Sequence, residues 1–165
     1  MGQSLILGSL LRNDRGFTIV ELSVVIIALA ILAALTVSST VSYQSQSRDN
    51  ERAADIDVIS RALERSYRTQ AVSIGPTYPA STVGAAGLAT IVNEDDATKA
   101  PDQTSNSIVI ATTNAEQTPT INQYIYQPLN IDGSLCTSAP CVRYTLYYLL
   151  EKTNTVIRKD SMRQQ

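Results

Sequence analysis

The chain has 165 residues, a formal net charge of −2 and no histidine. This length suits one domain of modest size plus one membrane segment, and the charge gives no sign of a nucleic-acid-binding surface. Without histidine there is no Ser-His-Asp triad, no Cys-His pair and no histidine metal ligand, so the sequence predicts neither an enzyme nor a cofactor or metal site.

The first predicted element is an apolar helix over residues 17–37. A helix of this length spans the roughly 30 Å hydrocarbon core of a membrane. Arg12 and Arg15 precede it, so the positive-inside rule places the leader in the cytoplasm and the rest of the chain outside. Two simple interpretations are a cleaved secretory signal peptide, with "AILAAL" as its cleavage region, and an uncut signal anchor.

Glu21 is difficult for both of these interpretations. A charged side chain at the centre of the hydrocarbon core costs on the order of 2.5–3.5 kcal/mol on insertion scales. A signal peptide or a simple anchor gains nothing from this charge. Neither interpretation therefore explains why a carboxylate lies in this apolar segment.

The stretch "RGFTIVEL", residues 15–22, resembles the processing site of type IV pilins and pseudopilins. The resemblance implies that residues 1–16 are a leader ending in Gly16. It also implies that a prepilin peptidase and methyltransferase cuts after Gly16 and methylates the new amino-terminal residue, Phe17. Glu21 then corresponds to the glutamate at the fifth mature position. Because the cut precedes the apolar run, the helix remains as the anchor.

The same resemblance gives Glu21 a role in assembly. In the family, this glutamate is thought to meet the amino terminus of a neighbouring subunit in the growing filament. A buried carboxylate and a buried amine are each costly alone and tolerable as a pair. The alternative is a self-contained pair, in which Glu21 bonds to its own terminus or to Thr18.

The resemblance predicts a homo-oligomeric helical filament that forms through the amino-terminal helices. The subunit would lie in the cytoplasmic membrane as a single-pass protein before assembly and in an extracellular pilus afterwards. Such a pilus would serve adhesion, twitching motility or DNA uptake. Two alternatives stay open: a pseudopilin of a type II secretion or competence machine, and a signal-anchored ectodomain protein that never polymerises.

A second, amphipathic part of the helix is predicted over residues 38–75. Neither proline nor glycine occurs from Phe17 to Ile74, and Gly75-Pro76 supplies a stop signal. Apolar residues recur at helical spacing: Ala53, Ile56, Ile59, Leu63, Tyr67, Ala71 and Ile74. On the opposite face, the pairs Asp57–Arg61 and Glu64–Arg68 have the favourable i,i+4 order and predict a solvated charged face.

The remainder is predicted as a loop region and a small sheet. Residues 76–123 are the loop between helix and sheet, with a short helix or strand at 88–92 and a strand at 107–113. Its acidic residues lack the ligand spacing of a defined calcium loop and are interpreted as solvated. Residues 124–165 are rich in β-formers with short connections, which predicts an antiparallel meander. The expected fold is α+β, with the long helix packed on this antiparallel sheet.

Cys136 and Cys141 are the only cysteines. Because this part of the chain is predicted to enter an extracytoplasmic compartment, a disulfide is favoured over two free thiols. A metal site needs more ligands than two cysteines supply. So small a loop would contribute roughly 2 kcal/mol through chain entropy.

Overall fold

The computed structural model describes residues 16–69 and 75–163, without the side chains of residues 35–41, 68 and 69. The predicted leader therefore lies outside the described residues, apart from Gly16. The chain divides into two compact units, residues 1–40 and 41–165. The helix α1, Ile19–Thr69, contributes to both units, and each unit is described by itself.

In the carboxy-terminal unit, α1 packs on the sheet through the predicted apolar stripe. Ile56, Ile59 and Leu63 are fully buried, while Ala53 and Tyr67 are partly buried against the same core. Helical spacing brings these side chains onto one face, and their burial supplies most of the stability of this part of the helix. The last two residues of the predicted stripe, Ala71 and Ile74, lie outside the described residues.

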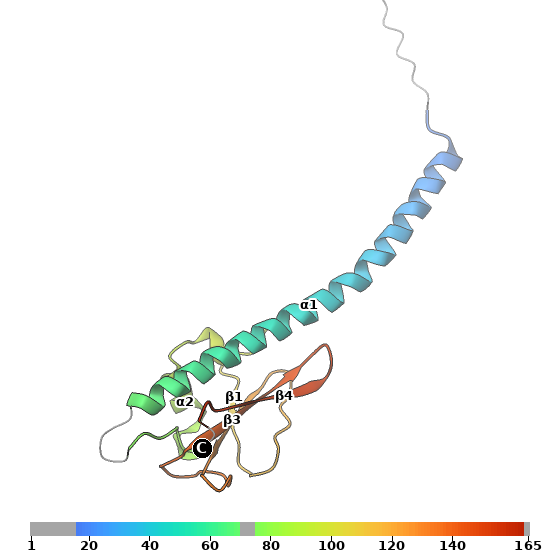
Figure 1. Cartoon of the computed structure of the whole chain (residues 1–165). Helices are drawn as coiled ribbons and strands as arrows, with labels where there is room; N and C mark the ends of the chain where they lie inside the picture. The colour runs from blue at the N-terminus through green and yellow to red at the C-terminus, as the bar shows by residue number, and fades with distance from the viewer. Residues whose placement is uncertain (1–15, 70–74, 164–165) are drawn as a thin grey trace, which may run out of the picture. The chain divides into compact units, whose positions relative to one another are not determined.

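The sheet has the order β1-β2-β3-β4, and Figure 1 shows α1 running across it. Its strands are β1 (Ile108–Ile110), β2 (Tyr124–Leu129), β3 (Arg143–Leu150) and β4 (Thr155–Asp160). The antiparallel pairs β2–β3 and β3–β4 confirm the predicted meander. β1, however, pairs with β2 in parallel. The segment 111–123 is long enough for the crossover that a parallel pair needs.

The region between α1 and β1 contains short helices, so it is not only a loop. These are η1 (Ser81–Val83), α2 (Gly84–Val92) and η2 (Asp96–Thr98). The ambiguity at residues 88–92 is thereby resolved in favour of a helix. Leu88 and Val92 are buried in the core that α1 and the sheet share.

Glu64 contradicts the prediction of a solvated charged face. Its side chain is buried and accepts hydrogen bonds from the Tyr78 hydroxyl at 2.9 Å and the Tyr144 hydroxyl at 3.2 Å. The backbone N–H of Met162 donates to the same carboxylate at 3.0 Å. These donors replace water around the carboxylate, and this makes its burial tolerable. Asp57, by contrast, is exposed and pairs with Lys159 of β4.

Four charged residues join α1 to the turn after β3, and we call them the turn clamp: Arg48, Asp49, Arg52 and Glu151. Arg48 Nε donates to Glu151 Oε2 at 2.8 Å. Asp49 accepts from Arg52 Nη1 at 3.0 Å and from the backbone N–H of Glu151 at 2.7 Å. Asp49 and Arg52 are buried, so each supplies the partner that the burial of the other requires.

Candidate functional site

The predicted processing site lies just before the first turn of α1. Gly16 and Phe17 are outside the helix, and both are exposed, Phe17 to 85%. A side chain added at Gly16 would meet no atom within 4 Å. The peptide bond between Gly16 and Phe17 therefore lies in open, non-helical backbone, which is the kind of segment that proteolytic enzymes reach most easily.

Thr18 caps the amino terminus of α1. Its Oγ1 accepts a hydrogen bond from the backbone N–H of Glu21 at 3.1 Å, and its carbonyl accepts one from the N–H of Leu22 at 3.1 Å. The hydroxyl thus satisfies one of the N–H groups that a helix start leaves without a partner. The sequence "TIVE" has the Thr-x-x-Glu spacing of a capping box. This spacing is a local signal for a helix start at Thr18, one residue after the start predicted at Phe17.

Glu21 lies in the first turn of α1, where a negative charge is favoured by the helix dipole. Its carboxylate has no hydrogen-bond or ion-pair partner among the residues that the structure describes. Glu21 is also the only charged residue between Gly16 and Ser47. The site therefore presents a single carboxylate, four residues from the predicted new amino terminus at Phe17.

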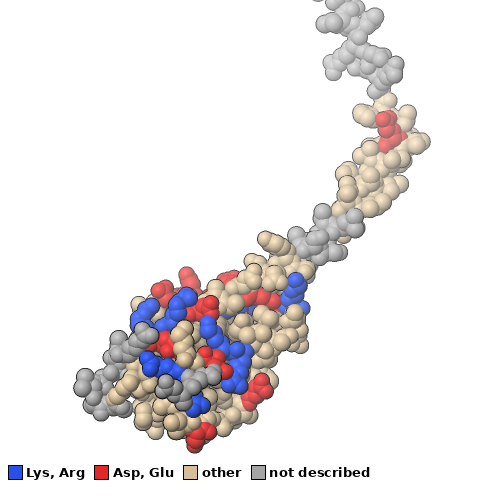
Figure 2. All heavy atoms as spheres, viewed as in Figure 1, with Lys and Arg blue, Asp and Glu red and all other residues tan. Residues whose placement is uncertain are grey.

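The surface around Glu21 is apolar. Every side chain from Phe17 to Ala34 is exposed, and Figure 2 shows a surface of this part of α1 that is almost free of charged side chains. Ile19 and Val20 are exposed to 87% and 71%, and the large side chains of the following turns are exposed to at least half. A helix that is apolar all round is normally buried in a protein core or a membrane.

No helix in the described part of the chain is long and apolar enough to cross a membrane. Residues 35–37 of the predicted membrane segment lie outside the described side chains.

The structure thus brings Gly16, Phe17 and Glu21 together at the start of α1. Cys136 and Cys141 lie in the other unit and form a disulfide with 5.7 Å between their Cα atoms, as predicted. Both cysteines are fully buried. The bond belongs to the core of the carboxy-terminal unit and is not part of the amino-terminal site.

Comparison with known proteins gives one family match. Residues 11–37 match the family described as the prokaryotic N-terminal methylation motif. No curated protein and no solved structure matches the chain. The chain therefore carries the methylation motif that is typical of type IV pilins and pseudopilins, which are generally structural proteins without enzymatic activity. The motif implies a membrane-anchored prepilin that a prepilin peptidase processes.

Proposed function

We propose that the chain is the structural subunit of a type IV pilus. In this proposal the precursor is cut after Gly16 and methylated at Phe17. The mature chain then polymerises through its amino-terminal helix into a filament on the cell surface. The observation that carries the proposal is the exposed, predominantly apolar surface of residues 17–34, with Glu21 as its only charge.

This surface requires a cover, because large contiguous apolar surfaces on soluble proteins mark interfaces or membrane contacts. Before assembly, the cover would be the lipid of the cytoplasmic membrane. After assembly, it would be the same helix of neighbouring subunits. Both environments are apolar and therefore match a helix without a polar face. A filament core built from such helices would exclude water, as the membrane does.

Glu21 supports polymerisation over a simple anchor. In a lipid or filament core, a carboxylate needs a positive partner, and the described part of the chain provides none. Cleavage after Gly16 would create an amine at Phe17, and each subunit would then carry one cation and one anion within a single helical turn. Pairing of Glu21 with the Phe17 amine of a neighbour satisfies both charges and sets the position of one subunit against the next.

Mass spectrometry of filaments sheared from cells tests this function. We expect an abundant mature chain that begins at Phe17 and carries one additional methyl group. A mature chain confined to the membrane fraction would indicate a short pseudopilus or a protein that never polymerises. A terminus near Ala34, as signal peptidase would leave it, would exclude the prepilin pathway altogether.

A further inference from the structure

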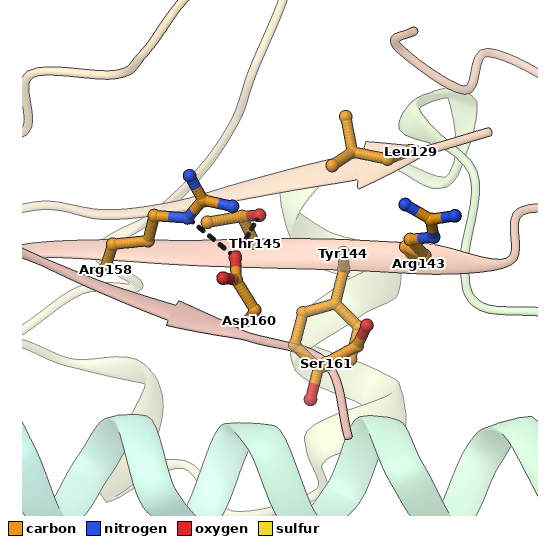
Figure 3. Close-up of a pocket in the computed structure, with 7 residues that line it drawn as sticks. All are labelled: Leu129, Arg143, Tyr144, Thr145, Arg158, Asp160 and Ser161. Atoms are coloured by element: carbon orange, nitrogen blue, oxygen red, sulfur yellow. Dashed lines mark hydrogen bonds and ion pairs between the residues drawn. The ribbon is translucent and has the colours of Figure 1, made fainter. Parts of the chain in front are cut away.

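The face of the sheet that points away from α1 carries a groove with two arginines. Along β3, Tyr144, Leu146 and Tyr148 pack in the core with α1. Because side chains alternate along a strand, Arg143 and Thr145 lie on the other face. Figure 3 shows α1 on one side of β3 and the guanidinium groups of Arg143 and Arg158 on the opposite side.

The groove consists of two adjoining cavities of about 130 and 310 Å³. Leu129, Arg143, Thr145 and Arg158 belong to the walls of both cavities, so the two cavities are neighbours on this face. The larger cavity alone is at the lower end of the size range of small-molecule pockets. The groove is therefore large enough for one sugar ring with a substituent.

The smaller cavity favours an anion. Its walls contain two guanidinium groups and one carboxylate, that of Asp160. Asp160 accepts hydrogen bonds from Arg158 Nε at 2.7 Å and from Thr145 Oγ1 at 2.8 Å. These bonds offset its charge and fix the guanidinium plane of Arg158, whose remaining N–H groups can form the forked pair that a carboxylate accepts.

The larger cavity shares both guanidinium groups with the smaller one and adds neutral hydrogen-bonding groups. It is lined by the exposed side chains of Asn114 and Glu116 and, at its floor, by Gln127. The amide of Gln127 already donates to the carbonyls of Thr113 and Ala115. Sugar hydroxyls can donate to Glu116 and bond to Asn114 in either direction, so a ligand whose carboxylate lies against Arg158 can place its hydroxyl groups here.

We propose that this groove binds an acidic sugar, such as a hexuronate unit of a carboxylated polysaccharide. The carboxylate of the sugar would lie against Arg158 and Arg143, with its ring hydroxyls toward Asn114 and Glu116. The site belongs wholly to the unit of residues 41–165, and it does not depend on whether the chain polymerises. A saccharide site on the sheet face opposite α1 would give this unit an activity beyond filament formation.

Titration of the full chain in detergent micelles with sodium glucuronate tests the proposal, with NMR shifts of groove amides as the readout. We expect saturable shifts at Thr145 and Arg158. Arg158→Gln should weaken binding by about tenfold or more, because charge-assisted hydrogen bonds are lost. Arg158 is 57% exposed, so this variant should fold. The matched control is Arg163→Gln, which alters an exposed arginine outside the groove and should leave the affinity unchanged.

Two comparison ligands separate the parts of the proposed site. Glucose lacks the carboxylate and inorganic phosphate lacks the ring, so each should bind about tenfold more weakly than glucuronate, or not at all. Phosphate binding as tight as glucuronate binding would indicate a plain anion site and overturn the saccharide assignment. Absence of saturable glucuronate binding, or equal affinity in Arg158→Gln, would overturn the site itself.

Discussion

The carboxylate of Glu64 accepts hydrogen bonds from the hydroxyl of Tyr78 at both of its oxygens, each at 2.9 Å. With the Tyr144 hydroxyl and the N–H of Met162, this carboxylate joins three segments that are distant in sequence: the segment after α1, β3 and the residues after β4. Tyr78 and Tyr144 also pack edge to face at 4.8 Å between ring centroids. Glu64 is thus a hydrogen-bonding centre of the core.

The first prediction concerns this centre. Glu64→Leu should lower the free energy of unfolding by about 1–3 kcal/mol, because it leaves the buried Tyr78 hydroxyl without an acceptor. The Tyr144 hydroxyl keeps Ser60 as a hydrogen-bond partner at 2.9 Å. Thermal unfolding of the full chain, followed by the near-ultraviolet signal of the tyrosines, provides the measurement. Glu51→Leu changes an exposed glutamate of the same helix and should shift the midpoint little. Equal shifts in both variants would show that the Glu64 bonds contribute no stability.

The second prediction concerns the turn clamp. Asp49→Ala should destabilise the fold by about 3 kcal/mol, because Arg52, only 2% exposed, would keep only the more distant carboxylate of Glu151, at 3.4 Å, as its ionic partner. The backbone N–H groups of Glu151 and Lys152 would lose their acceptor as well. The control is Asp95→Ala, which breaks the ion pair of Asp95 with Lys99. Asp95 is exposed, so this loss should be about 1 kcal/mol or less. Denaturant unfolding of the two variants compares these costs directly.

The third prediction concerns pH. Burial raises the pKa of Asp55 to about 6, although the hydrogen bond from Tyr124 acts in the opposite direction. The native state therefore holds this proton more tightly than the unfolded state, and the contribution of Asp55 to stability decreases as pH rises from about 4 to about 6. Asp55→Asn keeps an acceptor for Tyr124 and removes the titration. Relative to the unaltered chain, this variant should gain stability across that interval.

Glu151 provides the contrasting pH dependence. The hydrogen bond from Arg48 lowers the pKa of Glu151 to about 2, so its contribution is present above about pH 4.5 and is lost as pH falls toward 2. Unfolding curves at several pH values, with Glu151→Gln beside Asp55→Asn, separate the two groups. If the difference between Asp55→Asn and the unaltered chain were constant from pH 4 to 7, Asp55 would have an ordinary pKa.

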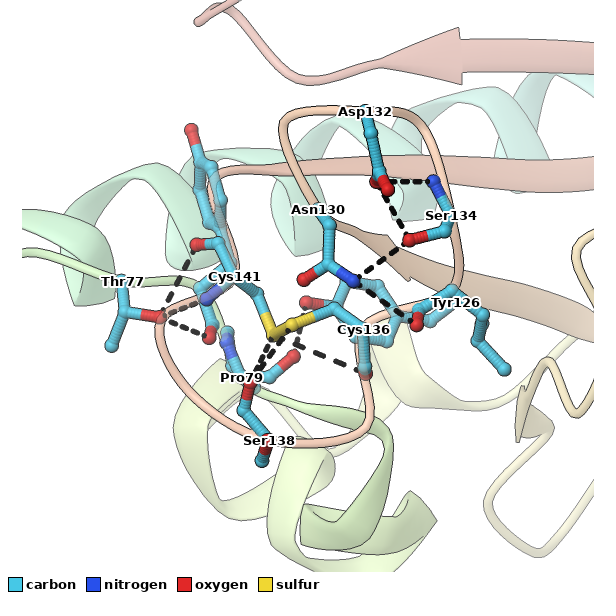
Figure 4. The surroundings of a disulfide bond; sticks show 11 residues. Thr77, Pro79, Tyr126, Asn130, Asp132, Ser134, Cys136, Ser138 and Cys141 are labelled. Carbon is cyan, nitrogen blue, oxygen red and sulfur yellow. Dashed lines mark hydrogen bonds between the residues drawn. A yellow bond between two sulfur atoms is a disulfide. The ribbon is translucent and has the colours of Figure 1, made fainter.

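The fourth prediction concerns the disulfide. Figure 4 shows the loop between Cys136 and Cys141 against the segment that follows α1. The carbonyl of Cys141 accepts from the N–H of Tyr78 at 2.8 Å, and the carbonyl of Cys136 accepts from the N–H of Ser81 at 3.1 Å. Replacing both cysteines by serine should lower the unfolding free energy by about 2 kcal/mol, the chain-entropy value for so short a loop, and should preserve the fold.

Amide hydrogen exchange shows which part of the unit loses stability when both cysteines are replaced by serine. Because the loop orients both carbonyls, the amides of Tyr78 and Ser81 should lose protection more than amides of β3 in the double variant. Uniform loss of protection throughout the unit would contradict a local role. Thiol labelling of the native protein without reductant tests the premise, since two reactive cysteines would mean that the bond is absent.

Local patterns account for what the sequence predicted correctly. The apolar spacing from Ala53 to Tyr67 and the β-rich runs of β2, β3 and β4 each lie within one short stretch, and so does the motif around Gly16. The burial of Glu64 depends on Tyr78 and Tyr144, which are 14 and 80 residues away. The parallel pairing of β1 and the presence of Arg143 and Arg158 in the wall of one groove likewise arise from tertiary structure. No local pattern reports such contacts.

The last prediction concerns Glu21 and assumes the proposed filament. If the carboxylate were needed only for processing, Glu21→Val would leave an uncut precursor. If it had no role, the variant would insert into the membrane more readily, by the roughly 2.5–3.5 kcal/mol that a charge costs at the hydrocarbon core, and would assemble normally. Assembly through a Glu21–Phe17 pair predicts a third result. The variant should insert and be cut after Gly16, yet fail to form filaments when it is the only subunit.

Glu21→Gln refines this test, because it keeps the hydrogen-bonding capacity of the side chain and removes its charge. The Phe17 amine of a neighbour requires the charge, so this variant should also assemble poorly. A partner that needs only a hydrogen-bond acceptor would tolerate the amide. Filament yield in the sheared fraction, compared with mature subunit in the membrane, distinguishes these cases. Normal filament yield from correctly cut Glu21→Val would reject the charge pair, since no other carboxylate lies between Gly16 and Ser47 to replace it.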